Sequence, residues 1–213
     1  YKPINRLQFL FGSSANIYDG DHFGRIIWAE YAATAGHDYE WYSGTGKKKE
    51  LNMFIKSNYQ ATNRLTLYGD IQLRTINYLI TGIDDDLRDI SQEHDFLFLN
   101  PKAGAFYDLH SNGSIYASVA IAHREPNRDN YTDADPSKPE PEAERLFDYE
   151  LGYHYDNNKF TFNANGYYMY YHDQLILTGD INDVGSAIMT NVDKSYRTGI
   201  ELSGGYYFTG DMA

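Results

Sequence analysis

The stretch that decides the fold runs from residue 65 to residue 74 and reads LTLYGDIQLR. Apolar and polar side chains alternate along it. One side carries Leu65, Leu67, Gly69, Ile71 and Leu73, and the other carries Thr66, Tyr68, Asp70, Gln72 and Arg74. A period of two is typical of a β-strand whose two faces have different surroundings. The stretch therefore predicts a strand with one apolar face and one wet face.

The same alternation recurs along most of the chain, where helical spacing is largely absent. Further alternating segments cover 7–11, 51–60, 97–109, 114–121, 147–155, 160–168 and 200–208. Together they predict about eight strands, several of which have 12 or more residues. Strands in soluble sheets average roughly 5–6 residues, whereas a tilted strand needs about 9–11 to cross a bilayer. The chain is expected to be all-β, with strands long enough to span a membrane.

The predicted connections alternate between short and long. Residues 62–63, 110–113 and 156–158 form short turns, whereas 80–95, 126–143 and 177–194 are long, polar and acidic. Outer-membrane barrels have short turns on the periplasmic side and long loops outside. The sequence thus predicts an antiparallel transmembrane β-barrel. Because short turns and long loops alternate along the chain, 19–49 is expected to be an extracellular loop. Within it, 26–42 is expected to form an extra hairpin.

Charged residues inside the predicted strands all take the polar side. We expect them to face the lumen of the barrel; they are Asp70, Arg74, Lys102, Asp148, Glu150 and Glu201. A Lys or Arg that faces lipid at the midplane costs about 2–4 kcal/mol, so a slip of one residue is strongly disfavoured. A soluble β-sandwich shows the same alternation. Strand length and the clustering of Tyr and Phe at strand ends favour the membrane barrel.

The composition excludes several classes of function. The chain has 18 Lys and Arg against 30 Asp and Glu, a net charge of −12, which argues against nucleic-acid binding. It contains no cysteine, which excludes thiol nucleophiles, Cys-ligated zinc and iron–sulfur clusters. The mean hydropathy of −0.60 is compatible with a membrane β-barrel, because strands that alternate apolar and polar residues have a polar average.

Four runs of sequence carry a more specific resemblance. They are AHREPNR (122–128), LFDYELGY (146–153), DQLILTG (173–179) and YRTGIEL (196–202). In this order they resemble the late barrel strands of TonB-dependent outer-membrane receptors. Residues 19–24 and 100–104 resemble segments of the Bacteroidetes-type members, so the resemblance covers nearly the whole of 1–213.

The resemblance implies a barrel of about 22 strands with a plug domain inside. The chain would then be a fragment of about eight strands, without the plug domain and the final strands. It implies a place in the bacterial outer membrane and import of a ferric siderophore, haem, cobalamin or an oligosaccharide. The implied partners are the TonB complex (through the plug), a small nutrient ligand and outer-membrane lipid, without nucleic acid or a cofactor.

Candidate ligand-binding residues lie in the segments outside the predicted membrane span. They are Trp28, Trp41, Tyr42, Arg124, Arg128 and Tyr131. Their rings could stack on a haem, a catecholate or a sugar, and their guanidinium groups could bind an anion. Two structural interpretations stay open: aromatic anchoring at the membrane interface, and ion pairs that stabilise the junction between strand and loop at 124–129.

No catalytic or metal site is expected. The acidic run at 84–86 does not fit a calcium loop, because Arg88 takes a ligand position and the glycine is missing. Asp148, Glu150 and His154 share a face, but no serine lies in a G-x-S-x-G context. The alternatives to a transport receptor are a small outer-membrane barrel acting as a passive pore or hydrolase, and a soluble β-sandwich binding module.

Overall fold

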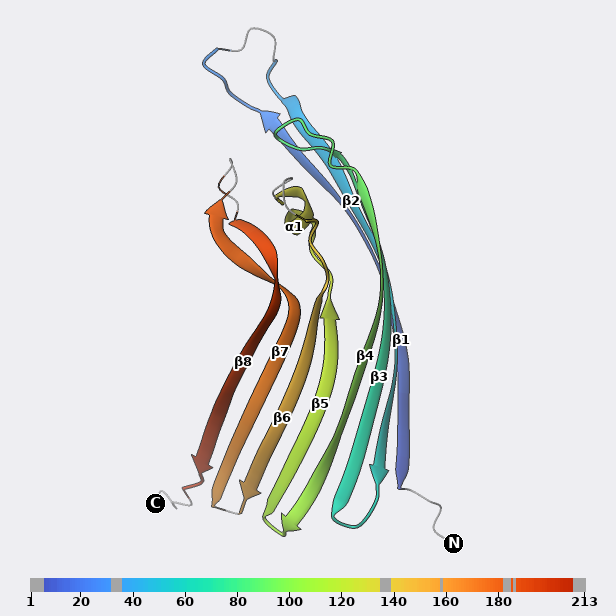
Figure 1. Ribbon diagram of the computed structural model, residues 1–213, viewed down its shortest axis with the longest axis vertical. Helices are drawn as coiled ribbons and strands as arrows, with labels where there is room; N and C mark the ends of the chain where they lie inside the picture. Colours follow the sequence, from blue (N-terminus) through green and yellow to red (C-terminus); the bar gives the residue numbers. More distant parts are fainter. Residues whose placement is uncertain are drawn as a thin grey trace, which may run out of the picture.

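Eight strands form a single antiparallel sheet in sequence order (Figure 1). The computed structural model describes residues 6–31, 36–134, 139–157, 159–181, 185 and 187–208. The strands are β1 (Leu7–Ile26), β2 (Tyr39–Gln60), β3 (Leu65–Ile83), β4 (Gln92–His110), β5 (Gly113–Arg124), β6 (Glu144–Asp156), β7 (Phe160–Ile181) and β8 (Ala187–Tyr206). A short helix, α1 (Arg128–Thr132), follows β5. The prediction of an all-β antiparallel fold is confirmed.

The sheet is open. Within the described residues, β1 and β8 are its two edges and do not pair with each other, and no second sheet packs against it. A β-sandwich requires two facing sheets, so the sandwich alternative is wrong. The open edges also argue against a small barrel closed by these eight strands alone.

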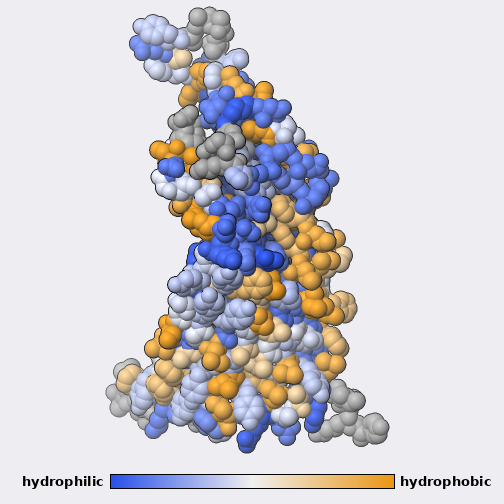
Figure 2. Space-filling view, viewed as in Figure 1, coloured by the Kyte–Doolittle hydropathy of each residue, from blue (hydrophilic) through white to orange (hydrophobic). Residues whose placement is uncertain are grey.

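The two faces of the sheet differ as the alternation predicts. The outward face is defined here as the one that carries Leu67, Ile71 and Leu73. Its apolar side chains are uncovered: Phe11 is 80% exposed and Ile200 is 78% exposed. In Figure 2, hydrophobic residues follow the right-hand border of the molecule, where β1 lies in the same view, and hydrophilic residues gather around its middle. The outward face therefore requires apolar surroundings.

Charged and aromatic residues bound the apolar part of the outward face. On five strands, the apolar band ends at an exposed, charged residue on the side of the long connections. These residues are Asp19, Lys49, Asp95, Arg145 and Lys194. Just below this line, the rings of Tyr149, Tyr168 and Tyr196 lie 6.4 and 6.0 Å apart in succession. Near the turn end, Tyr155, Phe160 and Phe162 form a second row. Two aromatic rows around an apolar band are typical of membrane barrels.

The strands continue beyond their alternating segments. β1 and β2 pair from Leu7 and Tyr59 out to Ile26 and Tyr39, with one register shift between Gly24 and Arg25. β1 and β2 therefore take up most of the described part of 19–49. Pairing needs only backbone hydrogen bonds, so the ladder continues where apolar and polar side chains no longer alternate. The extracellular loop with a hairpin at 26–42 stays a prediction.

Pro101 limits the pairing of β4 on one side. A proline has no N–H to donate, so an interruption of the ladder is expected there. Pro101 stays in register with Ile71 of β3, but pairing with β5 ends at Lys102 and Ala120. The interruption thus falls on the β5 side alone.

The buried core lies on the inner face, near the long connections. Ile76, Tyr78 and Ile80 of β3 pack with Ile90 and Phe98, and α1 covers them with Tyr131. Among the described residues, no helix has the length and apolar character needed to cross a membrane.

Candidate functional site

The inner face carries all six residues that the sequence predicts to face the lumen. Alternation along each strand and the register between strands place Asp70, Arg74, Lys102, Asp148, Glu150 and Glu201 on this one face. Asp70 lies opposite both Lys56 and Lys102, and Lys56 Nζ is 3.3 Å from Asp70 Oδ2. Whether this face lines a water-filled lumen stays a prediction.

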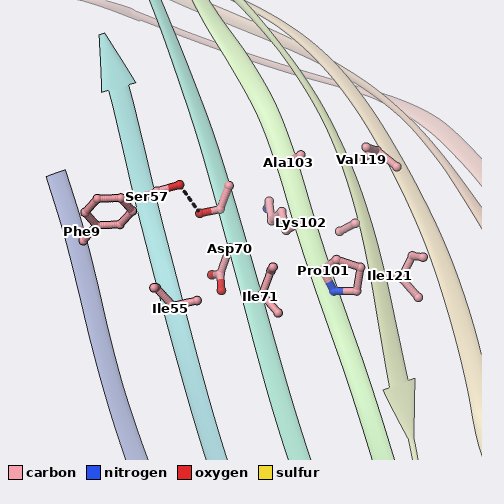
Figure 3. A pocket seen from close by; sticks show the side chains of 12 residues that line it. Phe9, Ile55, Ser57, Asp70, Ile71, Pro101, Lys102, Ala103, Val119 and Ile121 are labelled. Atoms are coloured by element: carbon pink, nitrogen blue, oxygen red, sulfur yellow. Dashed lines mark hydrogen bonds between the residues drawn. The ribbon is translucent and has the colours of Figure 1, made fainter. Parts of the chain in front are cut away.

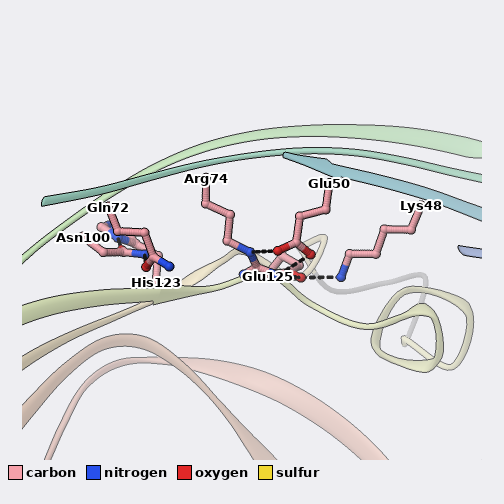
Figure 4. A network of polar contacts seen from close by, with 7 residues as sticks. All are labelled: Lys48, Glu50, Gln72, Arg74, Asn100, His123 and Glu125. Carbon is pink, nitrogen blue, oxygen red and sulfur yellow. Dashed lines mark hydrogen bonds and ion pairs between the residues drawn. The ribbon is translucent and has the colours of Figure 1, made fainter. Parts of the chain in front are cut away.

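Four charged residues on the inner face form one connected group, which we call the Glu125 cluster: Lys48, Glu50, Arg74 and Glu125 (Figure 4). Arg74 donates from Nε to Glu50 Oε1 (2.7 Å) and from Nη1 to Glu125 Oε2 (2.7 Å). Lys48 donates to Glu125 Oε1. Two cations and two carboxylates balance one another.

Glu125 is the buried member of the cluster and its three partners are partly buried, so the balance of charge around Glu125 is energetically important. The side chain of Glu125 is only 6% exposed. Burial alone would raise its pKa, but the hydrogen bonds from Lys48 and Arg74 outweigh that and hold the pKa below its usual value. Removing one partner from a buried ion pair leaves an uncompensated charge, at a cost of about 3–5 kcal/mol.

Local sequence brings Glu125 to this position. Pro126 is fully buried directly after β5, and Asn127 and Asn130 form a reciprocal capping box that starts α1. Tyr131 of α1 then stacks on His94 at 3.9 Å. Residues 125–132 are therefore folded onto the inner face, with the Glu125 cluster where they begin.

A second polar chain lies beside the cluster. Asn100 donates to Gln72 Oε1 at 3.1 Å, and the His123 ring lies 2.8 Å from Asn100 Oδ1 (Figure 4). His123 also stacks on Phe98, with ring centroids 5.2 Å apart. These contacts link β4 and β5 beyond Ala120, where their backbone pairing has ended.

The six predicted ligand-binding residues lie on four segments of the chain. Trp28 is 78% exposed after β1. Trp41 is exposed and donates to the carbonyl of Asp85 at 2.9 Å, and Tyr42 lies across Gly24. The other three, Arg124, Arg128 and Tyr131, surround the β5–α1 junction.

These last three have structural partners. Arg124 pairs with Glu144 at 2.5 Å, and Arg128 lies 3.7 Å from Asp129. Tyr131 is 7% exposed, and burial raises its pKa. The ion pairs agree with the structural interpretation of 124–129. A ligand-stacking role for Tyr131 would require its ring to leave His94.

The described residues contain no group of three or more His, Asp or Glu side chains that could hold a metal ion. In the acidic run, Asp84 accepts from the backbone N–H of Asp86 and of Arg88 and pairs with the Arg88 guanidinium at 2.7 Å. These contacts within the turn give the Asp84 carboxylate its hydrogen-bond partners. His154 lies 2.6 Å from Asn163 Oδ1, and Glu150 accepts from Ser118 at 3.3 Å.

The partners of Glu125 were not foreseen from the sequence. The sequence predicts Arg74 on the polar side of its strand, but Lys48 and Arg74 are 77 and 51 positions away from Glu125. Spacing along the chain does not indicate such contacts, since they depend on how the connection after β5 folds back.

The family assignment rests on a match along nearly the full chain. Residues 3–213 match the family model described as TonB dependent receptor-like, beta-barrel. This chain belongs to the TonB-dependent receptor β-barrel family. A search of curated proteins gives no match. The predicted family and fold are thereby confirmed.

Solved TonB-dependent receptors share the fold. The copper transporter OprC gives a TM-score of 0.77 at 17% identity, covering 97% of this chain and 33% of OprC. The ferric-catecholate import receptor Fiu from E. coli K12 gives 0.70 at 14% identity, with 95% and 33% covered. The ferric yersiniabactin uptake receptor FyuA from Yersinia pestis gives 0.68 at 16%, with 96% and 30% covered. The chain spans about a third of the length of these structures.

Proposed function

We propose that the chain is part of the barrel wall of an outer-membrane receptor that binds and imports a scarce nutrient with energy from TonB. The nutrient is a ferric siderophore, haem, cobalamin or an oligosaccharide. The observation that carries the proposal is the family match over 3–213. The protein acts as a transporter in this proposal and not as an enzyme. A Bacteroidetes-type origin stays a prediction.

The exposed apolar band supports the outer-membrane location. It lies between two aromatic rows and ends at charged residues on the side of the long connections. Such a surface is stable against lipid and unstable against water. Outer-membrane lipid is therefore one of the proposed partners.

The inner face supports the presence of a further segment against it. Its charged side chains are not covered by this chain: Lys56 and Glu201 are exposed, and Asp70 and Glu150 are partly exposed. A plug domain, through which TonB would act, would lie against this polar face.

The cargo is the second part of the proposal. The related structures are a copper transporter, a ferric-catecholate import receptor and a ferric yersiniabactin uptake receptor. Because two of these three names include a ferric compound, we propose a ferric siderophore as the first candidate to test.

Uptake measurements test the proposal. The gene for the complete protein is deleted, and uptake of labelled ferric siderophores, haem, cobalamin and oligosaccharides is compared with that of the parent strain and of a strain lacking TonB. We expect uptake of one ligand to be lost in both mutants and restored by the complete gene. Uptake that needs the gene but persists without TonB would contradict active transport.

A further inference from the structure

The outward face contains a groove of about 510 Å³ over β1 to β5 (Figure 3). One row of paired residues crosses it: Phe9, Ser57, Gly69, Ala103 and Val119. The three middle residues of the row are small and the two end residues are large. The next outward row, formed by Ile55, Ile71 and Pro101, makes one wall. The groove is thus a hollow bounded by large side chains; a second hollow of the same face lies over β5 to β8 and includes Ala164 and Gly166.

The chemistry of the groove admits hydrocarbon only. The Ser57 hydroxyl donates to the carbonyl of Gly69 at 3.4 Å, so its hydrogen is engaged. Asp70 and Lys102 border the groove, but alternation places their side chains on the inner face. No charge faces the occupant, and a polar ligand would lose hydrogen bonds to water without replacement.

The width of the groove fits a single acyl chain. The three small residues, Ser57, Gly69 and Ala103, span two strand spacings of about 4.8 Å, or roughly 10 Å, between the larger Phe9 and Val119. One extended hydrocarbon chain that lies along the strands fits between these two side chains. A protein partner fits less well, because a specific interface uses about 20–30 residues a side and twelve residues line the groove.

The position of the groove selects the leaflet. Gly69 lies near the start of β3 and Ser57 near the end of β2, so the groove lies close to the short turn between them. In outer-membrane barrels the short turns are periplasmic, and the periplasmic leaflet consists of phospholipid. We propose that this groove binds one acyl chain of a phospholipid from the periplasmic leaflet. The inference rests on the proposed outer-membrane location.

Filling the groove tests the inference. The complete receptor is purified from membranes in mild detergent, and retained lipids are counted by native mass spectrometry. Gly69→Leu and Ala103→Leu fill the groove; a Cβ at Gly69 would meet only Ser57 Oγ, at 3.4 Å. Ala117→Leu, on the outward face of β5 but outside the groove, is the matched control. We expect the unsubstituted and Ala117→Leu proteins to retain one phospholipid more than either filled variant.

Folding and location are checked in parallel, so that the two proposals can fail separately. Circular dichroism and recovery from the outer membrane should be the same for all variants. Equal phospholipid counts in folded variants would overturn the groove assignment, as would retention of lipopolysaccharide instead of phospholipid. Absence of the complete protein from the outer membrane would overturn the proposed function itself.

Discussion

Glu125 is the residue that contributes most to holding the segment after β5 against the inner face. It is buried and accepts hydrogen bonds from both Lys48 and Arg74. Replacing Glu125 with Gln leaves two cations opposite one carboxylate. We expect the variant to lower the free energy of unfolding of the complete protein by about 3–5 kcal/mol, measured by urea unfolding in lipid vesicles.

Asp19→Asn is the matched control for Glu125→Gln. Asp19 pairs with Lys47 at 3.2 Å, but both side chains are more than half exposed. Exposed pairs contribute about 0–1 kcal/mol. If both variants lost the same free energy of unfolding, the ion pairs of Glu125 would contribute no more than an exposed pair.

The pKa of Glu125 predicts how the connection responds to acid. Its pKa in the folded state lies below the usual value of 4.5. A carboxylate with a lowered pKa contributes stability that is complete above its unfolded pKa and is lost as the pH falls through the folded pKa. We therefore expect protease protection of residues 125–134 to be constant near neutral pH and to decline only below about pH 4.5. Loss of protection between pH 7 and pH 6 would contradict this assignment.

At the scale of elements, glycines opposite aromatic residues fix neighbouring strands on the inner face. Five cross-strand pairs share this arrangement: Gly12 with Phe54, Gly24 with Tyr42, Gly104 with Tyr68, Gly152 with Tyr116, and Gly199 with Tyr167. In each pair the ring lies where a Cβ on the glycine would be. The Tyr116 ring crosses β6 in this way, and its hydroxyl donates to Asn165 Oδ1 of β7 at 3.0 Å.

This arrangement makes Gly152 sensitive to substitution. A Cβ at Gly152 would lie 2.0 Å from Tyr116 Cε1, so Gly152→Leu must displace the ring and break its bond to Asn165. We expect a loss of about 1–3 kcal/mol, typical of overpacking, measured by urea unfolding of the complete protein. At Gly166 the nearest contact of a new Cβ is the Leu151 carbonyl at 3.9 Å. Gly166→Ala should therefore change stability little, and a similar loss there would refute the ring displacement.

The strands could be predicted from the sequence, but their full lengths could not. Alternation located β3 because its membrane part must separate apolar from charged residues. It did not locate the outer part of β1 and β2, where Asp19 pairs with Lys47 and backbone pairing alone continues the ladder. Gly152 was predicted on the polar side, but its partner Tyr116 depends on register, which a single strand does not reveal.

At the scale of the whole molecule, the family and the shared face of the six charged strand residues were predictable, whereas the relative positions of the candidate ligand-binding residues were not. Alternation along the strands is enough to place Asp70 and Glu201. Trp28 and Arg128 are candidates by residue type alone; Trp28 follows β1, and Arg128 begins α1. Convergence of such residues depends on the connections between strands, whose paths do not follow from alternation.

The central claim is that the outward face meets lipid, and a cysteine scan along β3 tests it most directly. The chain has no cysteine of its own, so single substitutions at 67–74 in the complete protein can each carry a spin label. Collision rates with oxygen, which concentrates in lipid, are measured in membranes. We predict high rates at Leu67, Ile71 and Leu73, and low rates at Tyr68, Asp70 and Gln72. Collision rates that do not alternate from one residue to the next, or that are high on the charged side of β3, would contradict the account.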